Sequence, residues 1–364
     1  MTKAWTLYTY LGRQILLGGA AVFGGVAALA FMIDLVEMLR RASGKEDVGF
    51  FTAMALSLLK LPSLTEKILP FAILFGAMFT FARLTRNQEL TIVRASGMSI
   101  WQMLLPAVAL TGLLGVVAVT VYNPFAATLA TRFEQLEARY LKGRPSLLAV
   151  SSSGLWLRQA DENGQSVIPA LRGSAQGLQL DDVIIFLYDT QNRFSGRIDA
   201  EHAALRDGYW LLQNAWETGS GRQPVLQEQL VLRTTLTPTQ IQDSFASPET
   251  ISFWELPRFI ATAEAAGFSA LRHRLHFYAL LATPFLFCAM ALIAASFSLR
   301  MSRLGGVSTL FLAGSFAGFL LYFISDVTHA LGLSGILPAL LAAWSPAAVA
   351  LLLGAATLLH LEDG

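Results

Sequence analysis

Charged residues and cysteine are scarce in this sequence. Only 14% of its 364 residues are charged, against roughly 25% in soluble domains, and 54% are hydrophobic. The single cysteine, Cys288, excludes an intrachain disulfide and a cysteine-based metal cluster. A net charge of +1 gives no basic excess of the kind that binds nucleic acid. The composition therefore argues against an ordinary cytosolic enzyme and against a disordered chain.

Motifs for nucleotide or metal chemistry are also missing from the sequence. Its one Gly-Lys pair, Gly44-Lys45, is followed by Glu46, so the chain has no phosphate-binding loop of the G-x-x-x-x-G-K-[ST] type. No H-E-x-x-H helix occurs, and the five histidines have no spacing that suits a metal ion. We therefore expect a non-catalytic chain that holds no cofactor.

The charges that are present gather in the middle of the chain. Residues 132–274 hold 30 of the 51 charged side chains, and both flanks are apolar. A membrane-spanning helix needs about 20 apolar residues. We predict six spanning helices, three before and three after the polar middle. The uncharged runs are residues 14–33, 68–82, 95–131, 275–299, 304–325 and 327–361.

These runs divide the chain into three parts. Residues 1–131 should hold the first three helices, with a cytoplasmic helical segment at about 84–97. Residues 132–272 should form the polar domain with a helical connection, and residues 273–364 the last three helices. The second run is too short to span, so its helix should begin earlier, near Leu61.

Basic residues in the short loops predict the orientation. The arginines of residues 83–94, together with Arg300 and Arg303, fall on the same side as the N-terminus, which the positive-inside rule makes cytoplasmic. We expect both termini in the cytoplasm, the first run as a retained anchor, and the polar domain in the periplasm. The connection over residues 34–67 carries five basic and five acidic residues on the outer side, against that rule.

The polar middle is expected to be all-β. Short segments that alternate or run apolar lie between turn signals, at a spacing that favours an antiparallel sandwich or jelly roll. Asp207-Gly208 predicts a hairpin turn, because such a pair tolerates positive φ angles. A helix should follow from about Ser252 to Ala266. The expected strands include residues 155–158, 166–171, 183–188, 209–213 and 225–233.

Glycines mark the first and fifth spans. Small residues allow two helix backbones to approach closely in lipid. The sequence leaves open whether these glycines pack within the chain, form a seam with another subunit, or line a movable gate. The positions are Gly18, Gly19, Gly24 and Gly25 in the first span, and Gly314 and Gly318 in the fifth.

One cytoplasmic stretch carries a family resemblance. Residues 87–98, Asn-Gln-Glu-Leu-Thr-Ile-Val-Arg-Ala-Ser-Gly-Met, resemble the [S/N]-E-L-x-x-[MLI]-[RQ]-A-[SA]-G signature of the LptF/LptG permease family. Residues 33–41 and 69–77 resemble the end of that family's first helix and its second helix. The family layout is three helices, a periplasmic β-jelly roll and three helices. The basic pair after the first helix and the segment 154–156 resemble the LptG branch more than the LptF branch.

The resemblance implies a function that composition does not show. Members of this family form the membrane heterodimer of the lipopolysaccharide exporter, so the second subunit would be an LptF-like permease. An LptB-like ATPase dimer would bind ATP and Mg, which fits the missing phosphate-binding loop here. An LptC-like bridge protein would receive lipopolysaccharide on the periplasmic side of the bacterial inner membrane.

The resemblance also assigns roles to individual positions. Glu89 would lie on a coupling helix that enters a groove of the ATPase, and the first and fifth helices would form lateral gates. Asp34 stands where some relatives carry a basic residue. Arg86, Leu90, Arg94 and Gly97 would flank Glu89. Arg40 and Arg41, helped by Lys45 and Arg132, would contact phosphates of lipopolysaccharide, because arginine binds phosphate through two parallel hydrogen bonds.

Two other classes of protein remain open at this point. A permease of another ABC exporter, for lipoprotein or peptide, would share the membrane layout but lack the coupling signature. A membrane sensor or scaffold would need no ATPase. For the basic residues, contact with ordinary lipid headgroups is the alternative to contact with a substrate.

Overall fold

The computed structural model divides the chain into two compact units. The first comprises residues 1–136, 252–254 and 274–364, and the second comprises residues 137–251 and 255–273. The structure describes residues 2–43, 49–89, 92, 95, 97–142, 148–151, 154–161, 164–170, 172–173, 179–189, 193–206, 208–219, 223–234, 247–265, 269–301 and 307–363.

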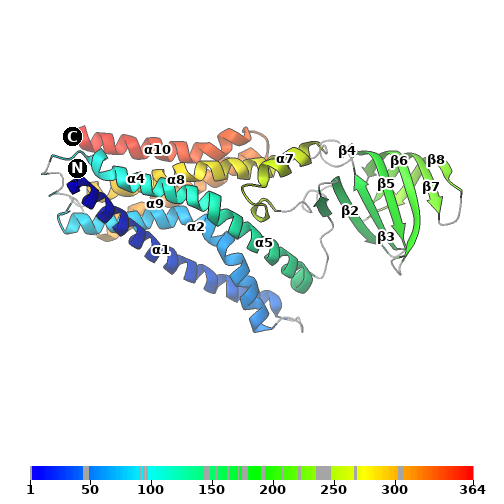
Figure 1. Cartoon of the computed structure of the whole chain (residues 1–364), viewed down its shortest axis with the longest axis horizontal. Coiled ribbons are helices and arrows are strands. Elements are labelled where there is room, and N and C mark those ends of the chain that lie inside the picture. The colour runs from blue at the N-terminus through cyan, green and yellow to red at the C-terminus, as the bar shows by residue number, and fades with distance from the viewer. Residues whose placement is uncertain are drawn as a thin grey trace. The chain divides into compact units, whose positions relative to one another are not determined.

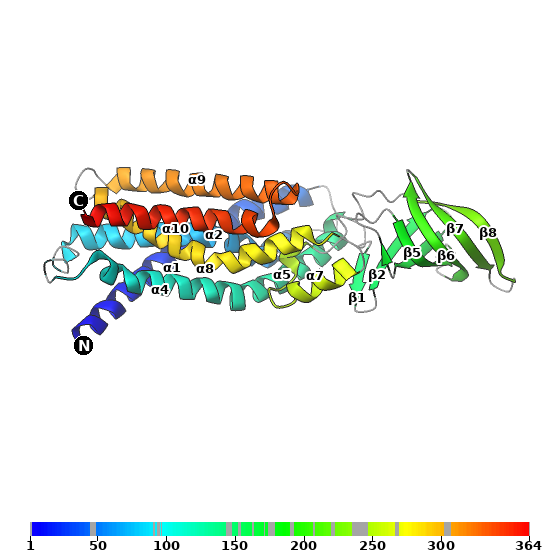
Figure 2. The same cartoon turned by 90° about the horizontal axis from the view of Figure 1, so that it is seen from above.

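The first unit is a helical bundle, and six of its helices are long and apolar enough to cross a membrane. This confirms the six predicted spans. Figures 1 and 2 show both termini at the same end of the bundle. The spans are α1 (Thr2–Ala42), α2 (Phe50–Arg86), the continuous run of α4 (Ile100–Val117), η1 (Ala118–Tyr122), α5 (Asn123–Glu137) and η2 (Ala138–Lys142), then α8 (Leu271–Met301), α9 (Val307–Leu333) and α10 (Ala339–Asp363).

The second spanning helix begins earlier than the sequence predicts. α1 continues to Ala42 and α2 starts at Phe50, so the connection between them is short. The expectation of a charged connection over residues 34–67 is therefore wrong. Asp34 and Lys60 lie inside the two helices and form an ion pair with each other. Charged side chains that find a partner across a helix interface do not end a helix.

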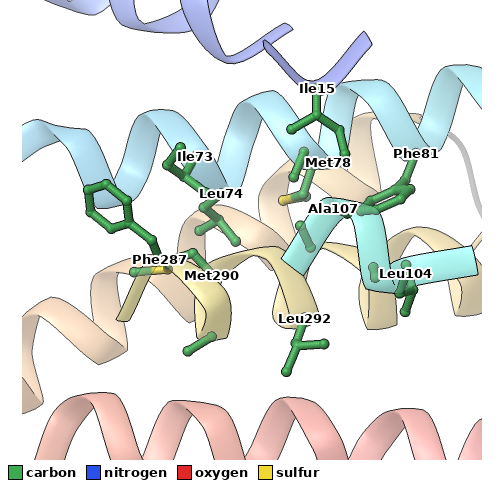
Figure 3. Packing of buried hydrophobic residues seen from close by; sticks show 14 of the residues in the cluster. Ile15, Ile73, Leu74, Met78, Phe81, Leu104, Ala107, Phe287, Met290 and Leu292 are labelled. Carbon is green, nitrogen blue, oxygen red and sulfur yellow. The ribbon is translucent and has the colours of Figure 1, made fainter. Parts of the chain in front are cut away.

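The apolar core of the bundle forms around α2. Figure 3 shows side chains of α2 surrounded by side chains from α1, α4 and α8. Close packing of this kind fills the interior at nearly crystalline density. The α2 residues labelled there are Ile73, Leu74, Met78 and Phe81, and their neighbours include Ile15, Leu104, Ala107, Phe287, Met290 and Leu292.

The second unit is built on one antiparallel sheet of eight strands. Its order is β1-β2-β3-β5-β6-β7-β8, with β4 paired to β5, so the described strands follow a meander. This confirms the predicted class, a six-helix membrane protein with an inserted all-β domain. The strands are β1 (Leu148–Ser151), β2 (Gly154–Asp161), β3 (Gly164–Ala170), β4 (Arg172–Gly173), β5 (Gln179–Tyr188), β6 (Phe194–Arg206), β7 (Tyr209–Gly219) and β8 (Val225–Arg233).

The predicted hairpin lies between β6 and β7. Arg206 pairs with Tyr209, and Gly208 has a φ of +84°, a conformation that glycine adopts without steric cost. The sheet buries one apolar face around Trp210, whose side chain is fully enclosed. The five expected strand segments fall largely within β2, β3, β5, β7 and β8. The expected helix is α7 (Leu256–Ala265), which begins four residues later than Ser252.

Candidate functional site

Two arginines in the last turn of α1 share one carboxylate. Arg40 donates from Nε and Nη2 to the two oxygens of Glu37, and Arg41 donates from Nε to one of them, all at 2.8 Å. Spacings of three and four residues place these side chains on one helix face. The Arg40 side chain is 74% exposed and the Arg41 side chain 47%. Both guanidinium groups are exposed enough for an external anion to reach them.

A second ion pair joins α1 to α2. Lys60 Nζ lies 2.6 Å from Asp34 Oδ1, and the Asp34 side chain is only 7% exposed. The second carboxylate oxygen, Oδ2, is buried and has no hydrogen-bond partner among the described residues. Lys60 Nζ also lies 5.7 Å from the centroid of the Phe133 ring on α5. Both Lys60 and Arg40 are thus paired inside the chain, but the Lys60 side chain is only 27% exposed.

The other two predicted anion contacts differ in position. Arg132 is exposed on α5 and is the sequence neighbour of Phe133, whose ring faces Lys60. Lys45 lies outside the described residues. The structure therefore brings Arg40 and Arg41 together and places Arg132 beside the residue that Lys60 contacts. The sequence did not predict the ion pair between Lys60 and Asp34, because the only signal was an acid and a lysine 26 residues apart.

The predicted coupling segment connects α2 to α4. Arg86 is the last residue of α2 and is exposed, and the side-chain Nδ2 of Asn87 donates to Glu89 Oε1 at 3.2 Å. Gln88 adopts a positive φ of 56°, which breaks the helix after Arg86. The segment expected from about residue 84 therefore shares its first residues with α2.

Beyond this break, the described residues show helical and turn geometry. The backbone N–H of Ile92 donates to the carbonyl of Gln88 at 3.1 Å, and the Ile92 side chain is 68% exposed. Gly97, with a φ of +85°, ends the segment before α4. Leu90 and Arg94 lie outside the described residues. Glu89 and Ile92 thus occupy an exposed connection that another protein can reach.

The glycines of the first and fifth spans fall into two groups. A Cβ atom on Gly18 would lie 2.6 Å from Thr80 Oγ1, and a Cβ atom on Gly76 of α2 would lie 2.5 Å from the Cα of Gly19. These glycines allow α1 and α2 to approach closely. Gly24 and Gly25, in contrast, meet no described atom within 4 Å.

The two glycines of α9 also pack within the chain. A Cβ atom on Gly314 would lie 2.3 Å from Met78, and one on Gly318 would lie 3.0 Å from Leu74. Both contacts are with α2, so Gly314 and Gly318 adapt α9 to the bundle. Among the predicted gate positions, a Cβ atom on Gly19, Gly24 or Gly25 would meet no described atom within 4 Å, and Gly19 alone of these three lies against Gly76.

Comparison with known proteins shows the family of the chain. Residues 9–360 match the family described as lipopolysaccharide export system permease LptF/LptG. The chain belongs to the LptF/LptG permease family. It is 23% identical to the lipopolysaccharide export system permease protein LptG of Escherichia coli strain K12, over 93% of this chain and 94% of the relative. The LptG of E. coli O6:H1 strain CFT073 gives the same values.

Membership of the LptF/LptG family fits the two units described above. Six apolar helices make the chain a multi-pass membrane protein, and the inserted sheet is its main polar part. Within the described residues, no group of three or more His, Cys, Asp or Glu side chains could hold a metal ion. The exposed basic turn of α1 and the connection after α2 are the candidate sites for an anionic lipid and for a protein partner.

Proposed function

We propose that this chain is an LptG-like permease subunit of an ATP-driven exporter. The exporter would extract lipopolysaccharide from the outer leaflet of the bacterial inner membrane and pass it to a periplasmic bridge. The observation that carries this proposal is the family match over residues 9–360, together with whole-length similarity to two LptG proteins. The chain itself is non-catalytic in this proposal.

The orientation follows from the basic residues at one end of the bundle. Arg13 belongs to the N-terminal part of α1, and Arg83 and Arg86 to the last turn of α2, which ends where both termini lie (Figure 1). The positive-inside rule assigns that end to the cytoplasm. The sheet unit then lies in the periplasm, and the basic turn with Arg40 and Arg41 lies at the outer face of the membrane.

That basic turn is proposed to contact the substrate. Lipopolysaccharide carries phosphate groups at the depth of the outer headgroups, and a guanidinium group binds a phosphate through two parallel hydrogen bonds. Arg40 and Arg41 are exposed and lie on one helix face, beside their shared carboxylate Glu37. Arg132 and Lys45 are proposed as further contacts to the same anionic groups.

The connection after α2 is proposed to bind the ATPase. An LptB-like dimer would hold ATP and Mg and contact Glu89, flanked by Arg86, Leu90, Arg94 and Gly97. The exposure of Arg86 and Ile92 supports a surface that a partner covers. An LptF-like permease would complete the membrane heterodimer, and an LptC-like protein would receive the lipid.

Purification from the native membrane tests this proposal. The chain would be tagged and solubilised gently, and its bound proteins and lipids identified by mass spectrometry. We expect an ABC ATPase, a second six-helix permease and lipopolysaccharide. The same proteins with bound lipoprotein or peptide would indicate another exporter. Recovery of the chain alone, under conditions that preserve known transporters, would indicate a sensor or scaffold.

A further inference from the structure

A buried asparagine joins three segments of the membrane unit. Asn123, the first residue of α5, is 1% exposed. Its side-chain nitrogen donates to Glu66 Oε1 of α2 at 2.9 Å, and its Oδ1 accepts the backbone N–H of Phe253 at 2.8 Å. One amide group thus bonds α2, α5 and the short segment of residues 252–254.

A proline explains the widened helical turn next to Asn123. In an α-helix, the residue four positions after Thr120 would donate its N–H to the Thr120 carbonyl, but that residue is Pro124, which has no N–H. The Thr120 carbonyl instead accepts the indole N–H of Trp254 at 3.1 Å. The N–H of Asn123 donates to Ala118, five residues back, which is π-helical spacing. Such turns often occur at functional positions.

Tyr122 completes the connection to α2. Its hydroxyl group is hydrogen-bonded to Thr65 Oγ1 and lies 3.3 Å from the carbonyl oxygen of Pro62. The bonds of Tyr122 and Asn123 therefore reach two turns of the same helix. We call this group the Asn123 cluster; its members are Pro62, Thr65, Glu66, Thr120, Tyr122, Asn123, Phe253 and Trp254.

The Asn123 cluster lies where the chain enters and leaves the membrane unit. α5 carries the chain out of that unit at residue 136, and residues 252–254 are the first part of the returning chain to belong to it. The Phe253 ring also stacks on Phe277 of α8, with centroids 5.5 Å apart. The outgoing connection is thus bonded to α2 directly, and the returning one is bonded to it through Asn123. The other end of α2, at Arg86, leads to Glu89.

We infer that Asn123 is a positioning residue for transport, a role that rests on the function proposed above. A displacement of α2 that begins at the ATPase contact near Glu89 would reach both connections to the sheet unit through the side chain of Asn123. Breaking either hydrogen bond of the buried Asn123 amide is costly, because it leaves a buried polar group without a partner. The three segments therefore move as one body.

The test compares two rates in the reconstituted complex. The chain, its partner permease and its ATPase are placed in proteoliposomes with lipopolysaccharide and the purified periplasmic acceptor protein. ATP hydrolysis and lipopolysaccharide release are measured separately. Asn123→Leu should keep hydrolysis within about twofold. The lipopolysaccharide released per ATP should fall about fivefold or more.

A matched control and a rescue separate positioning from general damage. Ser296→Ala removes a buried hydroxyl that donates to Leu292 and Ile293 of its own helix, and it should leave the ratio unchanged. Asn123→Asp alone should lower the ratio, because it sets two carboxylates against each other. Combined with Glu66→Gln, the new carboxylate can accept from both the Phe253 N–H and the introduced amide, and the ratio should recover.

Several results would overturn the inference. An unchanged ratio in Asn123→Leu, a proportional loss of both rates, or a failed rescue would each do so. If Asn123→Leu does not assemble, Trp254→Phe replaces it, because that indole is exposed and only its bond to Thr120 is lost. An unchanged ratio there would also overturn the inference. Wild-type complex that hydrolyses ATP without releasing lipopolysaccharide would instead contradict the proposed function.

Discussion

α1 and α2 are neighbouring helices of similar length that differ in burial. Both are apolar enough to span a membrane, yet only 6% of the most apolar stretch of α1 is buried, against 50% for α2. Apolar residues along α1, such as Leu29 and Met32, are more than half exposed. Hydropathy therefore finds both spans, while close packing determines which helix is central.

The difference follows from what each helix presents to its neighbours. α2 packs Gly76 against α1 and the side chains of Leu74 and Met78 against the glycines of α9. α1 contacts α2 through Gly18 and Gly19 in its first half and through Asp34 near its C-terminal end. A helix attached in this way presents its apolar middle to lipid or to a partner subunit.

The largest expected effect comes from closing the contact between the two helices. Gly76→Leu places a Cβ atom 2.5 Å from the backbone of Gly19, which cannot move without shifting α1. Overpacking costs about 1–3 kcal/mol and more where backbone must move, so we expect loss of folded protein. Gel filtration in detergent measures the yield of folded protein, and thermal unfolding measures its stability. Gly24→Leu, which meets no described atom within 4 Å, should behave like wild type. Equal stability of the two variants would contradict this account of α1 packing.

The next effect tests the ion pair near the other end of α1. Lys60→Met leaves Asp34 buried without its cation, and we expect a loss of about 2 kcal/mol, below the range for fully buried pairs because Lys60 is partly exposed. Thermal unfolding in detergent checks this. Adding Asp34→Asn should restore part of the loss, since the buried charge is then removed. Arg41→Met, which removes an exposed cation from α1, is the control.

The outcome for Asp34 and Lys60 shows what the sequence could predict and what it could not. Uncharged runs located all six spans, and Asp207-Gly208 located a hairpin, because both signals are local. The start of α2 was misplaced because Lys60 and Glu66 looked like a connection. Their partners, Asp34 and Asn123, come from other helices. No local pattern reveals such a partner.

The same contrast between local and long-range signals applies to the candidate site. The family signature pointed to Glu89 and Gly97, and the basic pair pointed to Arg40 and Arg41, all from contiguous residues. The sequence did not predict the Asn123 cluster, although it contains an Asn-Pro pair inside a 37-residue uncharged run. Its contact with Phe253 joins residues 130 positions apart, which only the tertiary structure shows.

A smaller effect concerns the connection that follows α2. Glu89→Ala should leave the yield of folded chain unchanged and lower the amount of ATPase that co-purifies by about tenfold, the loss expected when one charge contact of about 1.4 kcal/mol is removed. Quantitative pull-down from detergent measures it. Glu201→Ala, an exposed acid of the sheet that bonds Asn214, is the control. Full ATPase binding together with normal export would remove Glu89 from the proposed contact.

The smallest expected effect comes from the exposed arginines of α1. Arg40→Ala with Arg41→Ala should lower the stimulation of ATP hydrolysis by lipopolysaccharide about threefold at low salt, and less at high salt, because exposed charges are screened. Basal hydrolysis should not change. The control, Arg193→Ala with Arg197→Ala, removes two exposed arginines of the sheet unit that also pair with nearby carboxylates.

Glu37 allows a sharper version of that experiment. With both arginines removed, Glu37 adds a negative charge to the end of α1, so the double variant changes charge as well as contact. Glu37→Gln keeps both guanidinium groups and removes the carboxylate that they share. If phosphate binds Arg40 and Arg41 directly, this variant should reach half-maximal stimulation at a lower lipopolysaccharide concentration. If it responds like wild type, direct contact of phosphate with Arg40 and Arg41 would be contradicted, because removing their shared carboxylate should strengthen that contact.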